Sequence, residues 1–148
     1  MELKAEILNR YKQLVADRID VYRDRIAALT IDAQSDAKGS AGDKHETTLS
    51  MMHLEQEKLS IKLREALEQQ EALSRIQLAQ RDTAGAGSLI KSGNFNFFIS
   101  TALPKITVEH QFVFALSPQS PLGAALLGKK CGDEVQVQGK TYRIDEIL

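Results

Sequence analysis

Two long stretches without glycine or proline dominate the first half of this chain and constrain its fold more than any other feature. The first runs from Leu3 to about Ile31 and the second from about Asp43 to Arg81, with Gly39 to Gly42 between them. Apolar residues recur in both at helical steps of three and four. They include Leu3, Ile7, Tyr11, Leu14, Val15, Ile19, Tyr22, Ile26 and Leu29, then Leu59, Leu63, Ala66 and Leu73. The pattern predicts two long helices.

Each predicted helix carries only a narrow apolar stripe, which it cannot bury alone. Gln70 falls where the second stripe expects an apolar residue. Two helices of similar length joined by a short polar turn are expected to fold back on one another. We therefore predict an antiparallel coiled-coil hairpin over residues 1–82, about 40–50 Å long at 1.5 Å per residue, with an acidic tip near residues 40–47.

The composition changes at residues 82–88, Asp-Thr-Ala-Gly-Ala-Gly-Ser, which we interpret as a flexible linker and a domain boundary. All five phenylalanines and all three prolines lie beyond it. β-Branched and aromatic content predicts strands at Phe95–Ile99, Ile106–Val108, Gln111–Phe114, Glu134–Val137 and Thr141–Ile144. Ser120 as N-cap and Pro121 at the first position predict a short helix ending at Gly128. The fold class is α+β, with a small β-rich domain over 83–148.

Charge and hydropathy exclude several classes of protein. The net charge is −1, with 12 basic and 14 acidic residues in 1–80 and seven and six in 81–148, so neither half predicts a phosphate-binding surface. No stretch approaches the roughly 20 apolar residues that cross a bilayer, and the start of the chain lacks signal-peptide character. We expect a cytoplasmic protein without a membrane partner, and a monomer, although pairing through the apolar stripes stays open.

The single cysteine, Cys131, has no histidine near it in sequence, and we expect a structural or incidental role for it. Gly85-Ala86-Gly87 lacks the Gly-Lys-Ser/Thr ending of a phosphate loop. Ser117 and Ser120 have no recognisable triad partners, and their Ser-Pro pairs fit turns and helix starts.

Asp43 and Glu46 are the candidate functional residues of the tip. Spaced three apart on a helical turn, their carboxylates lie on one face. They could form a capping box, with Asp43 as N-cap and Glu46 satisfying its backbone amide, or present two acids to a partner. A transition-metal site that also uses His45 or His53 is a further alternative, because imidazole and carboxylate are ordinary zinc ligands.

Two motifs resemble those of the bacterial Gre transcript-cleavage factors, which bind RNA polymerase. Residues 42–46, Gly-Asp-Lys-His-Glu, look like the Gre tip pattern Gly-Asp-x-x-Glu. Residues 117–135 look like the C-terminal Gre signature, with Ser-Pro at its start, Ala-Leu-Leu-Gly-Lys in its centre and Gly-Asp-x-Val at its end.

The resemblance implies an FKBP-like C-terminal domain that docks on the polymerase, while the hairpin enters the secondary channel. The expected docking residues are Ser117, Pro118, Ser120, Pro121 and Leu122. Asp43 and Glu46 would help to hold a Mg²⁺ ion shared with the polymerase active centre, which itself cleaves the 3′ end of backtracked RNA. The protein would then be an accessory factor and not a free enzyme.

Two alternatives remain open at this stage. The chain departs from the Gre tip after Glu46, where it reads Thr47-Thr48-Leu49-Ser50 in place of Asn-Ala-Glu-Tyr. This departure favours a regulator that occupies the polymerase channel without promoting cleavage. The aromatic-rich C-terminal half is also compatible with an FKBP-like isomerase or chaperone.

Overall fold

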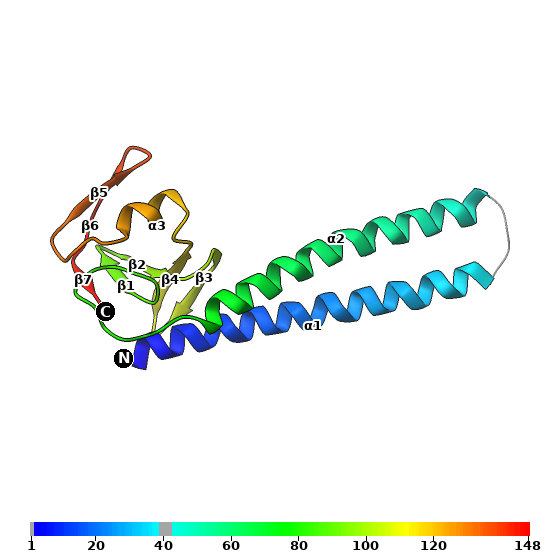
Figure 1. Cartoon of the computed structure of the whole chain (residues 1–148), viewed down its shortest axis with the longest axis horizontal. Helices are drawn as coiled ribbons and strands as arrows, with labels where there is room; N and C mark the ends of the chain where they lie inside the picture. Colours follow the sequence, from blue (N-terminus) through cyan, green and yellow to red (C-terminus); the bar gives the residue numbers. More distant parts are fainter. Residues whose placement is uncertain (1, 39–42) are drawn as a thin grey trace. The chain divides into compact units, whose positions relative to one another are not determined.

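A computed structural model describes residues 2–38 and 43–148, with side chains described for 2–35 and 46–148 (Figure 1). The helices are α1 (Glu2–Lys38), α2 (Asp43–Ser74) and α3 (Pro121–Leu126). The strands are β1 (Leu89–Ser92), β2 (Phe95–Ile99), β3 (Leu103–Val108), β4 (Gln111–Leu116), β5 (Glu134–Val137), β6 (Lys140–Arg143) and β7 (Glu146–Ile147). The predicted α+β class is confirmed, while the comparison with FKBP-like domains stays a prediction.

The chain divides into two compact units. One consists of Gln13–Gln70, and the other combines the first helical turns, up to Lys12, with Glu71–Leu148. We call them the hairpin unit and the sheet unit. The first turns of α1 therefore pack with the sheet unit, although they precede the hairpin in sequence. The boundary predicted at residues 82 and 83 stays a prediction.

The hairpin unit contains two antiparallel helices (Figure 1). Val15, Ile19, Leu59 and Ala66 of the predicted stripes are buried. Towards the distal end, Gln56 donates its amide hydrogen to the Thr30 hydroxyl across 2.8 Å, which joins the two helices. The heptad pattern thus predicted both the pairing of the helices and the faces they bury.

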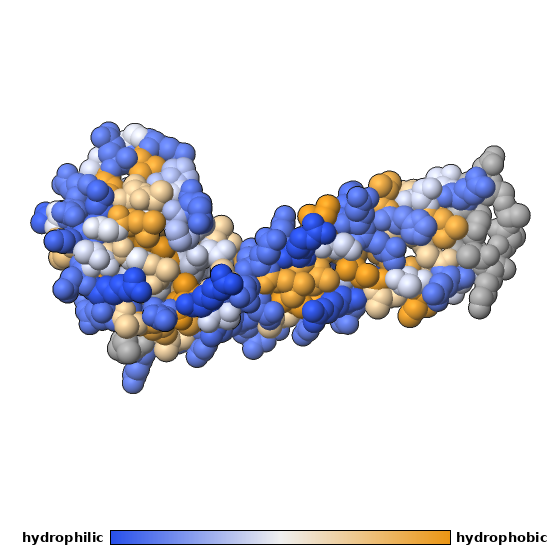
Figure 2. Space-filling model, in the orientation of Figure 1, coloured by the Kyte–Doolittle hydropathy of each residue, from blue (hydrophilic) through white to orange (hydrophobic). Residues whose placement is uncertain are grey.

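Apolar side chains also interrupt the hydrophilic outer surface of the hairpin (Figure 2). The large exposed ones in this unit are Val21, Ile31, Met51, Leu54, Ile61 and Leu67. Single exposed apolar residues are normal on a folded protein, so they show no partner by themselves.

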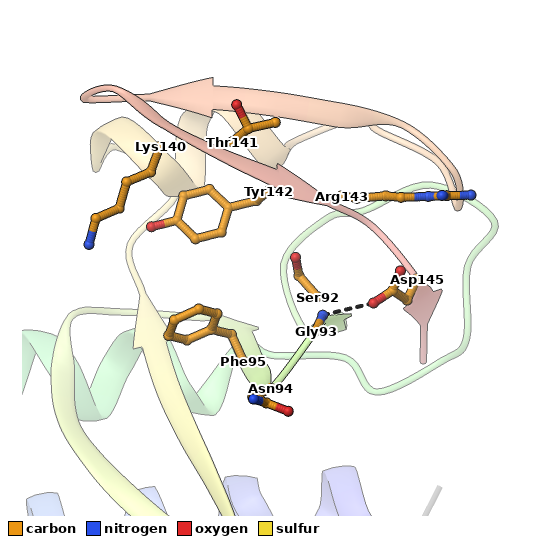
Figure 3. Close-up of a pocket in the computed structure, with 9 residues that line it drawn as sticks. All are labelled: Ser92, Gly93, Asn94, Phe95, Lys140, Thr141, Tyr142, Arg143 and Asp145. Atoms are coloured by element: carbon orange, nitrogen blue, oxygen red, sulfur yellow. Dashed lines mark hydrogen bonds between the residues drawn. The ribbon is translucent and has the colours of Figure 1, made fainter.

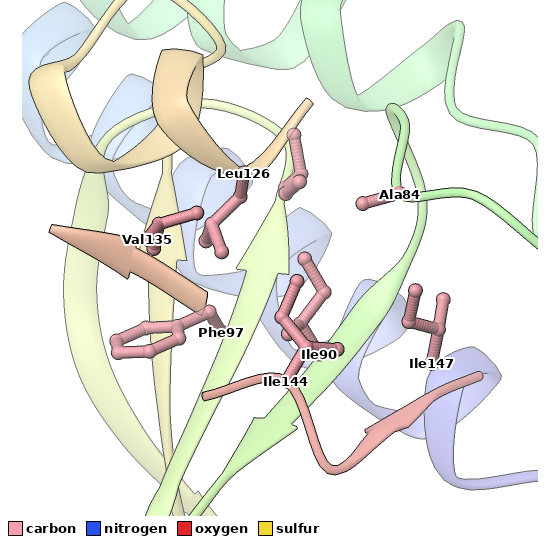
Figure 4. Close-up of a cluster of buried hydrophobic side chains, with 8 residues drawn as sticks. Ala84, Ile90, Phe97, Leu126, Val135, Ile144 and Ile147 are labelled. Atoms are coloured by element: carbon pink, nitrogen blue, oxygen red, sulfur yellow. The ribbon is translucent and has the colours of Figure 1, made fainter. Parts of the chain in front are cut away.

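The sheet unit is built on five strands in the order β3-β4-β2-β1-β7, with β5 and β6 forming a separate two-stranded hairpin. β2 and β4 are parallel, and the other neighbouring pairs are antiparallel. Buried side chains from the sheet, α3 and the β5–β6 hairpin meet in one core (Figure 4). They are Ala84, Ile90, Phe97, Ile99, Leu126, Val135, Ile144 and Ile147.

An aromatic cluster connects the β5–β6 hairpin with the sheet. Tyr142 lies edge-on to Phe97, with ring centroids 5.6 Å apart and an interplanar angle of 83°. Phe95 stacks on Phe97 at 5.6 Å and also meets the Tyr142 ring at 6.0 Å. Edge-to-face and stacked pairs are the favoured arrangements of aromatic rings, so this cluster holds the small hairpin over the start of β2.

The first turns of α1 pack against one face of the sheet, across β2, β3 and β4. Tyr11 donates its hydroxyl hydrogen to the carbonyl oxygens of Pro104 at 3.0 Å and Val113 at 3.3 Å, and its ring stacks parallel to Phe98. Arg10 reaches the carbonyl of Thr107 at 3.4 Å. Pro104 lacks a backbone amide, which limits strand pairing at its position on the outer edge strand β3.

The segment predicted as a flexible linker is part of the sheet unit, which corrects the sequence interpretation. Ala84 and Ser88 are buried. The amide of Ala84 bonds the carbonyl of Lys129, and the amide of Gly87 bonds that of Ile99, both at 2.8 Å. The small residues are needed for close packing here and not for mobility, so a pivot at Gly85–Gly87 is not supported.

Two strands were absent from the sequence prediction, and one helix is shorter than expected. β1 follows directly after the supposed linker and pairs with its neighbour β2 and with the distant β7, which has only two residues. Helix α2 ends at Ser74 instead of Arg81. The chain beyond it passes close to Gly87, where a side chain would overlap with the carbonyl oxygen of Gln77. Tertiary packing therefore overrides helix propensity after residue 74.

Candidate functional site

The two acids predicted at the tip belong to the start of α2. Asp43 is its first residue, and the side chains of Asp43 and His45 lie outside the described residues. Glu46 is exposed in the first turn. An acid in this position interacts favourably with the positive end of the helix dipole. A structural role as a capping box and a role in presenting carboxylates to a partner both remain compatible with this placement.

The described residues hold no cluster of three or more histidine, cysteine or acidic side chains that could bind a metal ion. His53 is exposed on α2. Carboxylate oxygens are the ligands that Mg²⁺ prefers, and proteins often supply only one or two of them. The exposed carboxylate of Glu46 fits such a partial site, whose remaining ligands would have to come from a partner and from water.

A tightly bonded turn leads into α3 at the other predicted site. The hydroxyl of Ser120 accepts from the amide of Gly123 at 3.1 Å and donates to the carbonyl of Ser117 at 2.7 Å. The amide of Gln119 bonds the Ser117 hydroxyl at 3.1 Å. The prediction that Ser120 is the N-cap and Pro121 the first helical residue is confirmed.

Gly123 completes this turn because it approaches the chain before it too closely for any side chain. A methyl group there would overlap with the carbonyl oxygen of Ser117 and lie 2.8 Å from the Ser120 hydroxyl. The serines and the glycine of the sequence signature therefore have structural roles, since they fix the backbone that presents the two prolines. Pro121 is exposed, and Pro118 is half-buried.

Three of the five predicted docking residues, Ser120, Pro121 and Leu122, line a cavity of about 250 Å³. Its other wall is the β5–β6 hairpin, from which Val137 and Tyr142 contribute. Ser117 and Pro118 are not part of this lining. The structure thus brings the start of α3 together with the tip of a hairpin that lies about 20 residues later in sequence, a juxtaposition that the motif alone did not indicate.

The rest of the C-terminal signature also supports the fold. Gly128 follows α3 with φ of 77°, and its amide bonds the carbonyl of Ala84 at 2.8 Å. The carboxylate of Asp133 accepts from the amide of Lys130 at 2.8 Å, which closes the turn before β5. Cys131 is exposed and contacts only the carbonyl of Asp145 in the described hydrogen bonding, at 3.0 Å, in agreement with an incidental role.

Two titratable groups lie buried in the first turns of α1, Lys4 and Tyr11. Lys4 is buried, and its ammonium nitrogen has no hydrogen-bond partner among the described residues. Burial lowers its pKa, and the nearby charge of Arg81 lowers it further. Burial raises the pKa of Tyr11 to about 12. Tyr11 belongs to the apolar stripe that the sequence predicted, whereas no sequence pattern pointed to Lys4.

A second, larger cavity of about 680 Å³ lies between the β5–β6 hairpin and the turn that joins β1 to β2 (Figure 3). In that view the rings of Phe95, from the sheet, and Tyr142, from the hairpin, project in the same direction and lie one above the other. Lys140 and Arg143 occupy the two ends of β6 beside them. The sequence did not indicate this site, because its two walls are about 45 residues apart.

A comparison with known protein families tests the resemblance seen in the C-terminal signature. Residues 107–147 match the family described as transcription elongation factor, GreA/GreB, C-terminal. This segment is a GreA/GreB-type domain. The matched range contains β4, α3 and the β5–β6 hairpin, together with every docking residue expected from the signature. The resemblance to Gre factors is therefore confirmed, and with it the broad assignment to transcription elongation factors.

Two solved structures are similar over most of their length. GreA factor homolog 1 (Gfh1) of Thermus thermophilus is 16% identical, with 93% of this chain and 94% of that chain covered and a TM-score of 0.36. A second structure of the transcription factor Gfh1 is 18% identical, with 93% and 92% covered and the same TM-score. No curated protein sequence is significantly similar to this chain. Within the described part of the chain, no helix is long and apolar enough to cross a membrane.

Proposed function

We propose that this protein is a Gre-like accessory factor of bacterial RNA polymerase. The observation that carries the proposal is the GreA/GreB-type domain at residues 107–147, which follows an antiparallel helical hairpin in the same chain. The C-terminal domain docks on the polymerase through the surface at the start of α3. The hairpin enters the secondary channel and brings its tip toward the active centre. The factor acts in the cytoplasm and has no independent hydrolytic activity.

The tip acids are the residues through which the factor acts on cleavage of backtracked RNA. Asp43 and Glu46 would hold Mg²⁺ together with ligands of the polymerase, and the ion would stabilise charge and activate water in phosphodiester hydrolysis. Glu46 is exposed, so its carboxylate is accessible to an incoming ion. Two carboxylates alone bind Mg²⁺ weakly, which suits a factor that must leave the channel again.

A second candidate is a regulator that occupies the channel without promoting cleavage. The residues after Glu46 favour it, because Leu49 stands where Gre tips carry an additional carboxylate and Ser50 stands where they carry an aromatic residue. This candidate requires the same docking and the same hairpin. The two candidates differ only in whether the tip promotes RNA cleavage once it lies in the polymerase channel.

Cleavage in a reconstituted, backtracked elongation complex separates the two. We expect wild-type protein to accelerate RNA cleavage and the Asp43→Ala/Glu46→Ala variant to lose the acceleration while it still binds the polymerase. Glu65→Ala/Glu68→Ala is a matched control, since both side chains are exposed on α2 at the same spacing and away from the tip. Binding without acceleration by the wild type would support the occluding regulator. Equal acceleration by the tip variant and the wild type would show that these acids are not the functional residues.

A further inference from the structure

The β6 strand has one edge that no other strand of the described residues covers. β6 pairs only with β5, in a two-stranded sheet separate from the five-stranded one. All four β6 residues line the 680 Å³ cavity, and no residue of β5 does so. The cavity therefore lies along the open edge of β6. Its opposite wall is formed by Ser92, Gly93, Asn94 and Phe95.

The hydrogen-bond pattern identifies the backbone groups that face this edge. Ile144 donates its amide to the carbonyl of Asp133 at 2.8 Å and accepts from the amide of Gly132 at 2.7 Å, so its peptide groups point toward the β5 side. Backbone groups of an antiparallel strand alternate in direction along the chain. The amides and carbonyls of Thr141 and Arg143 therefore point away from β5, toward the cavity.

The aromatic and charged side chains that line the cavity indicate which kind of ligand it can bind. Phe95 lines the cavity and is 43% exposed, so its ring is accessible there. Its ring and that of Tyr142 form an apolar floor. Lys140 and Arg143 are exposed at either end and take part in none of the described ion pairs, whereas the Asp145 carboxylate is already bonded to the Gly93 amide at 2.7 Å.

We propose that the open edge of β6 binds an extended peptide segment of a protein partner by strand addition. The segment pairs with the outward backbone groups of Thr141 and Arg143, places one aromatic or aliphatic side chain on Phe95 and Tyr142, and carries acidic residues opposite Lys140 and Arg143. Strand addition takes affinity from main-chain hydrogen bonds and specificity from pockets for alternate side chains, and both features are present here.

The charges argue against a second copy of this chain as the occupant. Two β6 edges paired with each other would bring Lys140 and Arg143 of both copies together, and like charges on neighbouring strands are destabilising. The outer edge strand β3, in contrast, carries Pro104, which lacks the amide that strand pairing requires. Among the strand edges with an adjoining cavity, β6 therefore fits an acidic segment best.

Selection of random peptides of about twelve residues, displayed on phage, against the full-length protein tests this inference. We expect enriched sequences to contain an aromatic or aliphatic residue flanked by aspartate or glutamate. Synthetic copies should lose at least about tenfold in affinity, or about 1.4 kcal/mol, toward Phe95→Ser and toward Lys140→Glu/Arg143→Glu. Phe112→Ser, which removes a 53% exposed phenylalanine elsewhere on the same sheet, and Lys58→Glu/Lys62→Glu on the hairpin are the matched controls and should bind as the wild type does.

Two readouts distinguish strand addition from other binding and require no change to the protein. Methylation of the alternate backbone nitrogens that face β6 should abolish binding of the peptide. Methylation of the intervening nitrogens, which face away from β6, should leave binding unchanged. Hydrogen exchange at the Thr141 and Arg143 amides should slow when the peptide is bound. The inference is overturned if no peptide is enriched, or if the Phe95 and Lys140/Arg143 variants bind the peptides as well as the control variants do. It is also overturned if N-methylation of the peptide has no effect, or if single-stranded RNA binds at this cavity in preference to the peptides. These outcomes are independent of polymerase binding, so the proposed function stands or fails separately.

Discussion

The hydroxyl of Tyr11 lies 3.0 Å from the carbonyl oxygen of Pro104, and this contact joins the first turns of the hairpin helix to the edge of a sheet more than 90 residues later in the chain. The same hydroxyl is 3.3 Å from the carbonyl of Val113. The tyrosine is fully buried, and its ring stacks on Phe98. It therefore contributes both packing and hydrogen bonding between segments that the sequence places far apart.

Replacing Tyr11 with phenylalanine should destabilise the protein by about 1–3 kcal/mol, since two buried carbonyls lose their shared donor while the ring packing is kept. Denaturant unfolding measures the difference. The control is Tyr22→Phe, because Tyr22 is a half-buried tyrosine on the same helix. This substitution should lower the free energy of unfolding by less than Tyr11→Phe does. Equal losses in the two variants would contradict the role given to the Tyr11 hydroxyl.

The same residue predicts a dependence of stability on alkaline pH. The pKa of Tyr11 is about 12 in the folded protein, above the ordinary value of 10, so the neutral form is favoured by folding. Its contribution is fully present below pH 10 and is lost as the pH rises from 10 through 12. The difference in unfolding free energy between wild type and Tyr11→Phe should be constant up to pH 10 and then shrink, by an amount on the order of 2–3 kcal/mol. A constant difference through pH 12 would contradict this assignment.

Lys4→Met should stabilise the protein at neutral pH. The lysine is 1% exposed, its ammonium nitrogen has no partner among the described residues, and Arg81 adds a repulsive charge. A buried, unpaired polar group costs about 1–3 kcal/mol, and methionine fills a similar volume without that cost. Thermal unfolding should show a higher midpoint than for wild type. A lower midpoint would mean that Lys4 has a bonded partner in solution.

Gly87→Ala should destabilise the protein by well over about 1 kcal/mol. Gly87 has φ of 89°, and a methyl group there would overlap with the carbonyl oxygen of Gln77. Gly85→Ala is the control, because its new methyl group would meet only the flexible end of the Arg81 side chain. Similar stability of the two variants would restore the view of this segment as a loose linker.

The turn between β3 and β4 offers a stabilising change. Glu109 and His110 form a two-residue hairpin turn with positive φ at both positions, 50° and 64°. Such turns favour Asn-Gly, and other residues in this conformation cost about 1–2 kcal/mol each. Glu109→Asn/His110→Gly should therefore raise the unfolding free energy. Gln138-Gly139, the corresponding turn of the β5–β6 hairpin, already has the favourable glycine. An unchanged or lower stability would show that other contacts of His110 outweigh the strain.

Local signals predicted much of this fold. The heptad spacing of Val15, Ile19 and Leu59 identified buried faces, because a helix of 3.6 residues per turn must place them together. Ser120 and Pro121 fixed the start of α3, because an N-cap is decided within four residues. The motif at residues 117–135 predicted the family of the C-terminal segment, which the match over 107–147 bears out.

Features that depend on distant partners were missed. Leu89–Ser92 directly follows the segment interpreted as a linker, and it forms a strand that pairs with the neighbouring Phe95–Phe98 and with the distant Glu146–Ile147. The burial of Lys4 depends on packing within the sheet unit, and a lysine in a helix is ordinarily exposed. The cavity between Phe95 and Tyr142 was not predicted either, because its two walls are far apart in the sequence. The roles of Asp43 and Glu46 at the tip stay predictions.

The most direct test of the central claim is binding of the full-length protein to bacterial RNA polymerase from the same source. Co-sedimentation with purified core enzyme should show a stoichiometric complex. Pro121→Asp/Leu122→Asp should weaken it by disturbing the surface at the start of α3, and Asp43→Ala/Glu46→Ala should leave docking intact. A far-ultraviolet circular dichroism spectrum unchanged by the substitutions would show that the variants are folded. The account predicts a complex that the docking variant loses, and absence of any complex with the wild-type protein would contradict it.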